Sequence, residues 1–224
     1  MTLTIAIPSK GVCSSRFAIA LKLLQTSPFE KIQCITVEGA DVAVARNLLV
    51  ESMLGDYIFF LDDDVIPPMN TIPKLYGRQK DIVSGLYFAK REPYFPQIFH
   101  KTKVQGKQMK DRYDAVFDIP ENELIEIDAC GGGCLLIKKD VFKKLKRPFF
   151  QYIPYGEEML KKGEDFYFSE KAKEAGFKIF CDTSIVCRHM GTASIGQEFW
   201  EISKERIKEL EEKLGPEKFK EFKV

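Results

Sequence analysis

The sequence has little histidine and no Cys-x-x-Cys pair, which argues against a structural zinc site. Its 224 residues include two histidines and six cysteines, and no two cysteines are spaced Cys-x-x-Cys. Without a secretion signal we expect no disulfide framework, and we interpret the cysteines as small buried apolar residues. Abundant Lys and Glu beside only three asparagines are weakly typical of thermophiles, so an intracellular disulfide stays an alternative. The cysteines are Cys13, Cys34, Cys130, Cys134, Cys181 and Cys187.

An excess of charge and a long apolar run are also missing. Lys plus Arg number 34 against 33 acidic residues, so electrostatics give no reason to expect nucleic-acid binding. The longest apolar run is about five residues, near Tyr57–Leu61, whereas a membrane-spanning helix needs about 20. Residues 1–8 lack the basic start and apolar stretch of a signal peptide. We therefore expect a cytoplasmic protein that does not bind nucleic acid.

The remaining composition supports one α/β domain over residues 1–224. Hydrophobic residues make up 45% of the chain, which is enough for a substantial core. In the first half, apolar strand patterns alternate with helix patterns that begin after Ser14 or Ser15 and after Asp41. This alternation predicts a mostly parallel central sheet flanked by helices. The predicted strands are Leu3–Ile7, Ile32–Val37, Tyr57–Leu61 and Ile82–Phe88.

The second half is less regular. The basic segment Lys90–Arg112 predicts a hairpin or a long mobile loop that could act as a lid. Asp140 is predicted to cap a short helix and Asp165 to open another. Glu198–Leu214 predicts a charged amphipathic helix that ends at Gly215-Pro216. Short strands are predicted at Ile125–Ile127, Leu135–Ile137, Phe177–Phe180 and Ile185–Cys187.

The strongest functional pattern is the triplet Asp62-Asp63-Asp64 directly after the apolar strand Tyr57–Leu61. Ligands of open α/β sheets bind at the carboxyl ends of strands, where these acids would lie. Three adjacent carboxylates repel one another unless a cation offsets their charge, and hard divalent ions prefer such oxygen ligands. The alternative is a solvated acidic turn.

Three further segments could contribute to a site. Glu164 and Asp165 could act chemically or simply stabilise the start of a helix. His189 follows a short strand, where it could be a ligand or a structural residue. Gly131–Gly133 could be a flexible turn or a place where backbone approaches a ligand closely.

Taken in order, these segments resemble the nucleotide-sugar-dependent glycosyltransferases of the GT-A fold, specifically the inverting, family-2-like group. The resemblance covers most of residues 3–191, and five short motifs in the right order make it fairly specific. It rests on Pro8-Ser9, on Val44-Ala45-Arg46-Asn47 (similar to an "ARN" helix), on Phe60–Asp64 (similar to "flDxD"), on Asp128–Gly133, on Gly163-Glu164-Asp165 (similar to the "ED" motif) and on His189.

The resemblance implies a Rossmann-like GT-A domain that transfers a sugar from a nucleoside-diphosphate sugar to an acceptor hydroxyl. Asp165 would be the catalytic base, with Glu164 as the neighbouring candidate. Asp64 and His189 would hold Mn²⁺ or Mg²⁺, while Asp62 would reach the ribose or the water shell of the metal. The donor would be bound by Pro8, Ser9, Lys10, Glu38, Arg46, Asp62, Asp63, Gly132 and Gly133.

The same resemblance implies a division of labour along the chain. Residues 1–88 would bind the nucleotide sugar, residues 89–191 would bind the acceptor and carry catalysis, and residues 192–224 would form a helical tail. The "QxxRW" motif of processive members is absent, which argues for a single addition. The acceptor could be a glycan, a lipid-linked molecule or a protein. The basic stretches Lys90–Arg112 and Lys138–Arg147 could touch an acidic acceptor or the anionic inner face of the membrane, or be solvated faces.

Two other functions fit parts of the pattern. A phosphatase of the haloacid-dehalogenase type also places an aspartate after a buried strand, but normally after the first strand of the fold rather than the third. A non-catalytic nucleotide-sugar-binding module is disfavoured because the acids, the candidate base and His189 are all present.

Overall fold

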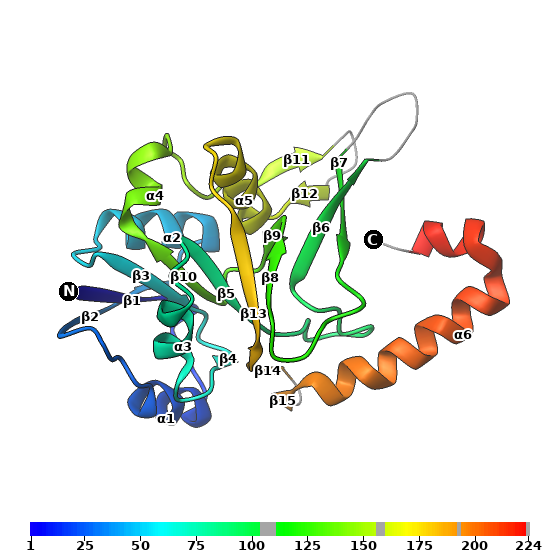
Figure 1. Ribbon diagram of the computed structural model, residues 1–224, viewed down its shortest axis with the longest axis horizontal. Coiled ribbons are helices and arrows are strands. Elements are labelled where there is room, and N and C mark those ends of the chain that lie inside the picture. The colour runs from blue at the N-terminus through cyan, green and yellow to red at the C-terminus, as the bar shows by residue number, and fades with distance from the viewer. Residues whose placement is uncertain (104–110, 156–159, 192–193, 223–224) are drawn as a thin grey trace.

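The computed structural model describes residues 1–103, 111–155, 160–191 and 194–222. These residues form a single mixed α/β domain around a seven-stranded sheet of order β2-β1-β3-β10-β5-β13-β8 (Figure 1). Five of the seven strands run in one direction, and β10 and β8 run against them. The strands are β1 (Thr2–Ser9), β2 (Lys31–Glu38), β3 (Tyr57–Leu61), β5 (Ile82–Leu86), β8 (Leu124–Ile127), β10 (Cys134–Lys138) and β13 (Ile179–Val186).

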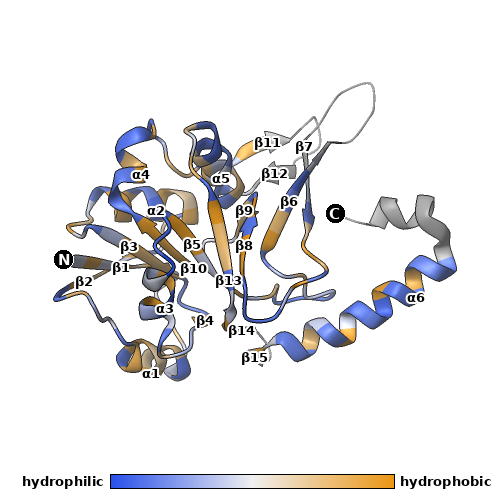
Figure 2. Cartoon of the chain, in the orientation of Figure 1, coloured by the Kyte–Doolittle hydropathy of each residue, from blue (hydrophilic) through white to orange (hydrophobic). Residues whose placement is uncertain are grey.

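The central strands are apolar because both faces of the sheet are covered, as the hydropathy colouring of Figure 2 shows. All five residues of β5 and the last four of β3 are buried. One core cluster packs α2, α4 and α5 on one face, and a second packs α1 and α3 on the other (Figure 1). The start of α6 joins the first cluster through Trp200, which packs against Phe95 and Phe117. The helices are α1 (Ser15–Leu23), α2 (Val42–Glu51), α3 (Thr71–Gly77), α4 (Lys139–Lys144), α5 (Glu164–Glu174) and α6 (Gln197–Phe222).

The predicted helix starts in the first half are confirmed by side-chain caps. The Ser14 hydroxyl accepts a hydrogen bond from the Phe17 amide at 3.1 Å, and the Asp41 carboxylate accepts one from the Ala43 amide at 3.0 Å. The cap at Asp41 has a functional consequence, because it begins α2 at the carboxyl end of β1 and β2 and so fixes the position of Arg46 one turn later.

Three small sheets surround the central one. In the first, the hairpin of β6 (Ile98–Lys103) and β7 (Asp111–Ala115) pairs with β9 (Ala129–Cys130). The hairpin prediction for the basic segment is therefore confirmed, although residues 104–110 lie outside the described residues. The second joins β11 (Ile153–Tyr155) and β12 (Leu160–Lys162). The third joins β4 (Val65–Ile66), β14 (Arg188–Met190) and β15 (Ser194–Ile195).

Some predictions of local structure are wrong. The helix predicted to stop at Gly215-Pro216 continues to Phe222 as α6, since one proline removes one backbone hydrogen bond and leaves those on either side. The strands predicted at Phe177–Phe180 and Ile185–Cys187 are largely one strand, β13. Cys13 and Cys34 are exposed, because they lie in a surface loop and on the edge strand β2. The other four cysteines are buried as predicted, and all six are free.

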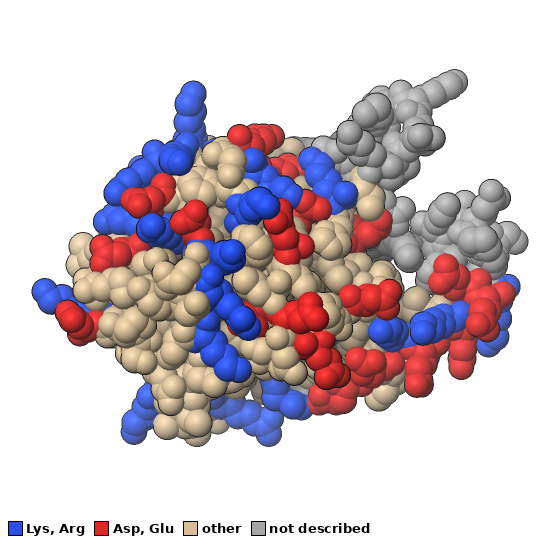
Figure 3. Space-filling model, viewed as in Figure 1, with Lys and Arg blue, Asp and Glu red and all other residues tan. Residues whose placement is uncertain are grey.

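The surface carries both charge signs interspersed, as Figure 3 shows for one face. This pattern agrees with the formal net charge of +1. Within the ranges given above, none of the helices has both the length and the apolar character needed to cross a bilayer.

Candidate active site

A cavity of about 380 Å³ opens at the carboxyl ends of β1 and β3. The chain places the end of β1 and the acidic triplet there because the two strands are parallel neighbours, with Ala6 opposite Phe60. Six residues predicted from the sequence line this cavity: Pro8, Ser9, Lys10, Asp62, Asp63 and Asp64. Asp41 and Tyr152 line it as well.

Asp63, which follows β3, is hydrogen-bonded to the end of β1 at this cavity. Its Oδ2 accepts a hydrogen bond from the Ser9 hydroxyl at 2.7 Å and another from the Lys10 amide at 3.2 Å. The Ser9 hydroxyl in turn accepts a hydrogen bond from the Gly11 amide at 2.9 Å. The carboxylate of Asp63 therefore shapes the loop after β1, which includes the predicted donor-binding residues.

Asp64 and His189 meet although 125 positions separate them in the sequence. The pairing of β14 with β4 sets His189 opposite Val65, the residue after Asp64. The distance from His189 Nε2 to Asp64 Oδ1 is 3.2 Å, and Lys90 forms an ion pair with Asp64 Oδ2. Burial acts to raise the pKa of Asp64, but the hydrogen bonds from His189 and Lys90 outweigh it and hold the pKa below its ordinary value.

The orientation of His189 bears on whether this pair suits a metal ion. The other ring nitrogen, Nδ1, lies 2.7 Å from the Phe88 carbonyl oxygen, which only accepts hydrogen bonds, so Nδ1 carries a proton. The hydrogen bond from Nε2 to Asp64 therefore exists only when the ring carries a second proton, whereas in the neutral ring Nε2 presents a lone pair toward Asp64 Oδ1. Two lone pairs in contact require a cation between them or a second proton on the ring. A metal-bound histidine commonly donates its other ring N–H to a backbone carbonyl, as His189 does here.

The donor set at this point fits a divalent ion that is completed by substrate oxygens. Mg²⁺ typically takes one or two protein ligands together with phosphates and water, and imidazole with carboxylate also suits Mn²⁺. The carboxylate of Asp62, which the resemblance places at the ribose or in the water shell of the metal, is bound by Arg46 and does not contact His189 or Asp64. In the part of the chain that the structure describes, no group of three or more His, Cys, Asp or Glu side chains is placed to share a metal ion.

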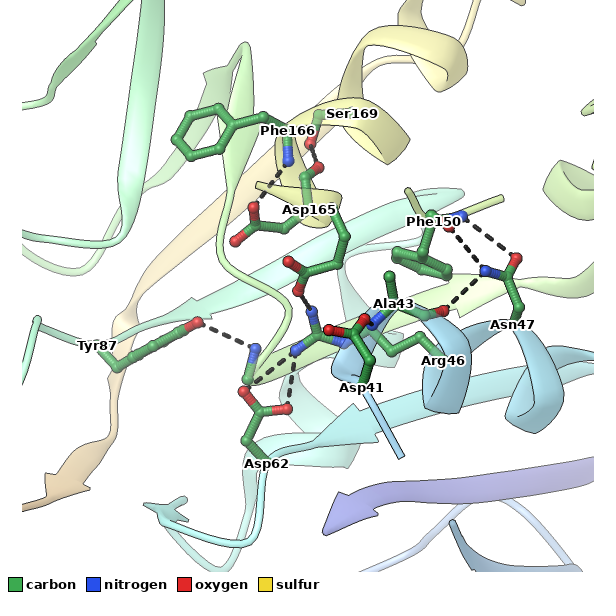
Figure 4. A network of polar contacts seen from close by, with 12 residues as sticks. Asp41, Ala43, Arg46, Asn47, Asp62, Tyr87, Phe150, Asp165, Phe166 and Ser169 are labelled. Carbon is green, nitrogen blue, oxygen red and sulfur yellow. Dashed lines mark hydrogen bonds and ion pairs between the residues drawn. The ribbon is translucent and has the colours of Figure 1, made fainter. Parts of the chain in front are cut away.

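Arg46 is the centre of a buried ionic network shown in Figure 4. Its side chain is 2% exposed, its Nη2 lies 2.9 and 3.1 Å from the two carboxylate oxygens of Asp62, and its Nη1 pairs with Glu164. Burial acts to lower the pKa of Arg46, but Asp62 and Glu164 outweigh it and raise the pKa. The guanidinium of Arg46 thus lies between two carboxylates, and its contact with the donor stays a prediction.

The glycine segment packs against groups of the protein itself. A Cβ atom on Gly132 would lie 2.5 Å from Cζ of Arg46, and one on Gly131 would lie 2.1 Å from the Tyr87 hydroxyl. The Gly133 amide donates a hydrogen bond to that hydroxyl at 3.0 Å. The glycines are therefore needed because the backbone closely approaches Arg46 and Tyr87. This is the close approach that the sequence suggested as one alternative, but the groups approached belong to the protein and not to a ligand.

Asp165 lies at the start of α5 beside this network (Figure 4). Gly163 occupies the cap position and makes no side-chain cap bond, while Asp165 Oδ1 accepts a hydrogen bond from the next amide, of Phe166, at 2.8 Å. Burial, and then the neighbouring Glu164 carboxylate, raise the pKa of Asp165 to about 7, against the opposing effect of Arg46. A carboxylate with a pKa near neutrality is suited to accept a proton at physiological pH.

Other predicted and unpredicted residues take clear places. Glu38 is exposed at the end of β2, opposite Ser9 in the strand register but not among the residues that line the cavity. Asn47 holds α2 in place: its amide donates to the Phe150 carbonyl at 2.7 Å and accepts from the Phe149 amide at 2.8 Å. This contact gives the Asn of the "ARN" segment a structural role.

Sequence reasoning missed Asp41, Tyr152 and, as a named residue, Lys90. Asp41 was recognised only as a helix cap, and its place on the cavity follows from α2 starting at the carboxyl edge of the sheet. Tyr152 lies in an irregular segment with no motif, and burial together with Glu164 raises its pKa. Lys90 stood within a segment expected to be mobile, and its pairing with Asp64 depends on the return of the chain after β5.

The model of the family described as "Glycosyl transferase family 2" matches residues 18–146. No curated protein sequence matches the chain.

Two similar solved structures share the fold. The crystal structure of A197 from STIV is 23% identical with a TM-score of 0.57, over 85% of this chain and 86% of that one. The crystal structure of GalNAc-T7 with UDP, GalNAc and Mn²⁺ is 13% identical with a TM-score of 0.58, over 92% of this chain and 48% of that one. This chain thus spans about half the length of GalNAc-T7.

Proposed function

This chain belongs to glycosyl transferase family 2, and on that basis we propose that it moves a sugar from a nucleoside-diphosphate sugar to an acceptor hydroxyl with inversion of the anomeric carbon. The observation that carries the proposal is the connection between the cavity and a candidate base. Asp62 on the cavity wall, Arg46 and Glu164 form one continuous network that leads to Asp165. Donor and acceptor chemistry would thus meet at the carboxyl edge of the sheet.

The two halves of the chain would have different tasks. We assign residues 1–88 to donor binding and residues 89–191 to acceptor binding and catalysis. Both contribute to one sheet, since β10 from the second half lies between β3 and β5 from the first. Lys10 at the cavity and Lys90 beside Asp64 would add positive charge near the diphosphate.

Asp64 and His189 would hold Mn²⁺ or Mg²⁺, which would stabilise the negative charge on the departing diphosphate. On the protein side, His189 is oriented by the Phe88 carbonyl, so that its Nε2 faces the same point as Asp64 Oδ1. GalNAc-T7, which shares the fold, was crystallised with UDP, GalNAc and Mn²⁺.

Asp165 would accept the proton of the acceptor hydroxyl. As the hydroxyl oxygen forms its bond to the anomeric carbon, the bond from that carbon to the diphosphate oxygen breaks, and the diphosphate leaves with the electron pair. Attack opposite to the leaving group inverts the anomeric configuration. Glu164 is less suited to this role, because its side chain is 8% exposed and pairs with Arg46.

The phosphatase alternative is poorly supported by the geometry. A nucleophilic aspartate needs a free carboxylate oxygen directed at the substrate phosphorus. The first acid after β3, Asp62, is the residue in the position of that nucleophile, and both of its oxygens are in hydrogen bonds to Arg46. The family assignment also favours glycosyl transfer over a phosphatase.

The proposal is tested by incubating the protein with a panel of uridine, guanosine and thymidine diphosphate sugars, with Mn²⁺ or with excess chelator. Release of the nucleoside diphosphate is measured, together with the thermal midpoint of unfolding. We expect one nucleotide class to stabilise the fold only when Mn²⁺ is present, and its sugar conjugate to be slowly consumed. Stabilisation without consumption of any donor would favour the non-catalytic binding module. Release of inorganic phosphate from simple phosphate esters would favour the phosphatase.

A further inference from the structure

Arg46 connects two parts of the candidate site that come from distant parts of the chain. Asp62 follows β3, whereas Glu164 begins α5, 118 positions away from Arg46. The guanidinium lies between them at 2% exposure, with Gly132 packed against it and its Cζ 5.9 Å from the centre of the Phe150 ring. Its position is thus determined on all sides by protein groups.

The bonding of Arg46 leaves little freedom to change partners. Nη2 pairs with both oxygens of Asp62, and Nη1 pairs with Glu164. Among the described residues, its Nε is a buried nitrogen without a hydrogen-bond partner. A buried ion pair that loses one partner leaves an uncompensated charge, which is strongly unfavourable. If the guanidinium turned toward a diphosphate, the buried carboxylate of Glu164 would lose its partner and its charge would be uncompensated.

Asp165 is affected by charged and titratable groups from four elements. They are Glu164 on its own helix, Arg46 on α2, Tyr87 after β5 and Cys130 on β9. Among these groups Arg46 is the cation, and it neutralises the carboxylate adjacent to Asp165 in the chain. If the guanidinium were removed, two neighbouring carboxylates would compete for one proton in a poorly hydrated place.

We propose that Arg46 is a positioning residue, which keeps Asp165 able to accept the acceptor proton by holding Glu164 and the start of α5 against Asp62. The inference rests on the proposed function, in which Asp165 is the base. It replaces the role expected from the sequence, in which Arg46 touches the diphosphate. The two roles make different predictions, because a positioning residue affects turnover and its pH dependence, whereas a diphosphate ligand affects nucleotide affinity.

The decisive variants are Arg46→Gln, Arg46→Lys and the double variant Arg46→Gln, Glu164→Gln. Turnover is measured between pH 5 and 9. In Arg46→Gln we expect the acidic limb of this profile to shift to higher pH, and turnover at neutral pH to fall about tenfold for each pH unit of the shift. The dissociation constant of the nucleoside diphosphate with Mn²⁺ should change less than about threefold, which is under 1 kcal/mol, because a positioning residue does not contact the nucleotide. The double variant removes the competing carboxylate, so its acidic limb should return toward that of the unmodified protein.

Arg46→Lys keeps a positive charge but cannot pair with two carboxylates in the same way. It should retain the pH profile and lose part of the turnover, and it provides the test if Arg46→Gln does not fold. Arg78→Gln is the matched control, because Arg78 also pairs with a buried carboxylate, that of Asp182 at 2.7 Å, away from the cavity. An unchanged pH profile in Arg46→Gln, or a loss of nucleotide affinity equal to the loss of turnover, would overturn the proposal.

A second readout does not depend on sugar transfer. The Asp165 carboxyl can be titrated by carbon NMR in protein labelled at aspartate, with Asp165→Asn used to assign its signal. We expect its midpoint to rise in Arg46→Gln and to fall back in the double variant. If the unmodified protein consumes no donor, the proposed function fails while this titration still decides the effect of Arg46. If the midpoint does not move, the positioning role is wrong even where transfer is observed.

Discussion

His189 directs Nε2 at Asp64 Oδ1 from 3.2 Å, while the Phe88 carbonyl oxygen holds its Nδ1 at 2.7 Å. This geometry gives the neutral imidazole a lone pair where a carboxylate already presents one. A cation between the two would resolve the conflict, and two ligands of one divalent ion at about 2.1 Å and near right angles lie about 3 Å apart. The contact is therefore compatible with a shared metal ion.

From this relationship we predict that Asp64→Asn and His189→Ala both weaken metal-dependent nucleotide binding. Each removes one of two protein ligands, so the affinity for Mn²⁺ in the presence of a nucleoside diphosphate should fall at least about tenfold. Isothermal titration calorimetry with and without Mn²⁺ measures the effect. His100→Ala is the control, because that histidine lies on β6 near Asp128 and away from the cavity. Full activity in excess chelator would contradict a metal role.

We predict that Asp165→Asn lowers turnover by roughly 10²- to 10⁴-fold with little change in nucleotide binding. Asparagine keeps an oxygen that can accept the Phe166 amide, and the helix cap is Gly163, so the start of α5 should not be disturbed. Turnover is followed by release of the nucleoside diphosphate, and NMR of the product gives its anomeric configuration. A retained configuration, or turnover close to that of the unmodified protein, would show that Asp165 is not the base.

The acidic triplet, the candidate base and His189 could be found from the sequence because each follows a strand or begins a helix with a recognisable pattern. Their partners could not. Arg46 was expected to bind the donor because of the family resemblance, and nothing local in the sequence indicates that Glu164 lies beside it. The contact requires β3, α2 and α5 to be packed together, which is a property of the whole fold.

The same limit applies to the sheet and to the surface cysteines. Leu135–Ile137 reads as a strand, but its insertion between β3 and β5 in the opposite direction is set by the connection through the glycine segment. Cys34 lies on the face of β2 that also carries Thr36 and Glu38, and all three residues are exposed. Its exposure follows from β2 being at the sheet edge, where no helix covers it completely.

The raised pKa of Asp165 predicts opposite effects of pH on activity and on stability. Turnover should rise as pH passes through about 7, because the base must be ionised. The folded state holds this proton up to about 7, whereas the unfolded chain releases it near 3.9, so between these values the folded state binds more protons. The contribution of Asp165 to stability is therefore present below about pH 4 and is lost as pH rises toward 7.

This pH effect is measured by denaturant unfolding at pH 5, 6, 7 and 8, with Asp165→Asn as the reference. The variant lacks the titrating group, so its stability relative to the unmodified protein should increase with pH over this range. A constant difference between the two proteins would mean that Asp165 has an ordinary pKa in the folded state.

The cysteines should be dispensable for catalysis. Burial raises the pKa of Cys130 to about 12, so this thiol does not form a reactive thiolate at neutral pH, and the Cys134, Cys181 and Cys187 side chains are buried away from reagents. We expect mild alkylation to modify Cys13 and Cys34, the two exposed thiols, without loss of turnover. Mass spectrometry locates the modified residues. Inactivation that donor prevents would instead indicate a thiol at the active site.

Gly132 should tolerate no side chain, because a Cβ atom there would lie 2.5 Å from Cζ of the buried Arg46. We predict that Gly132→Ala costs about 1–3 kcal/mol of unfolding free energy, as overpacking of a core typically does. It should also displace Arg46 from Glu164, so turnover should fall more than nucleotide affinity does. Gly77→Ala is the matched control: it lies at the end of α3 with no atom within 4 Å of the added carbon, and alanine is the better helix former. Equal stability of the two variants in urea unfolding would show that the glycine segment can move away from Arg46.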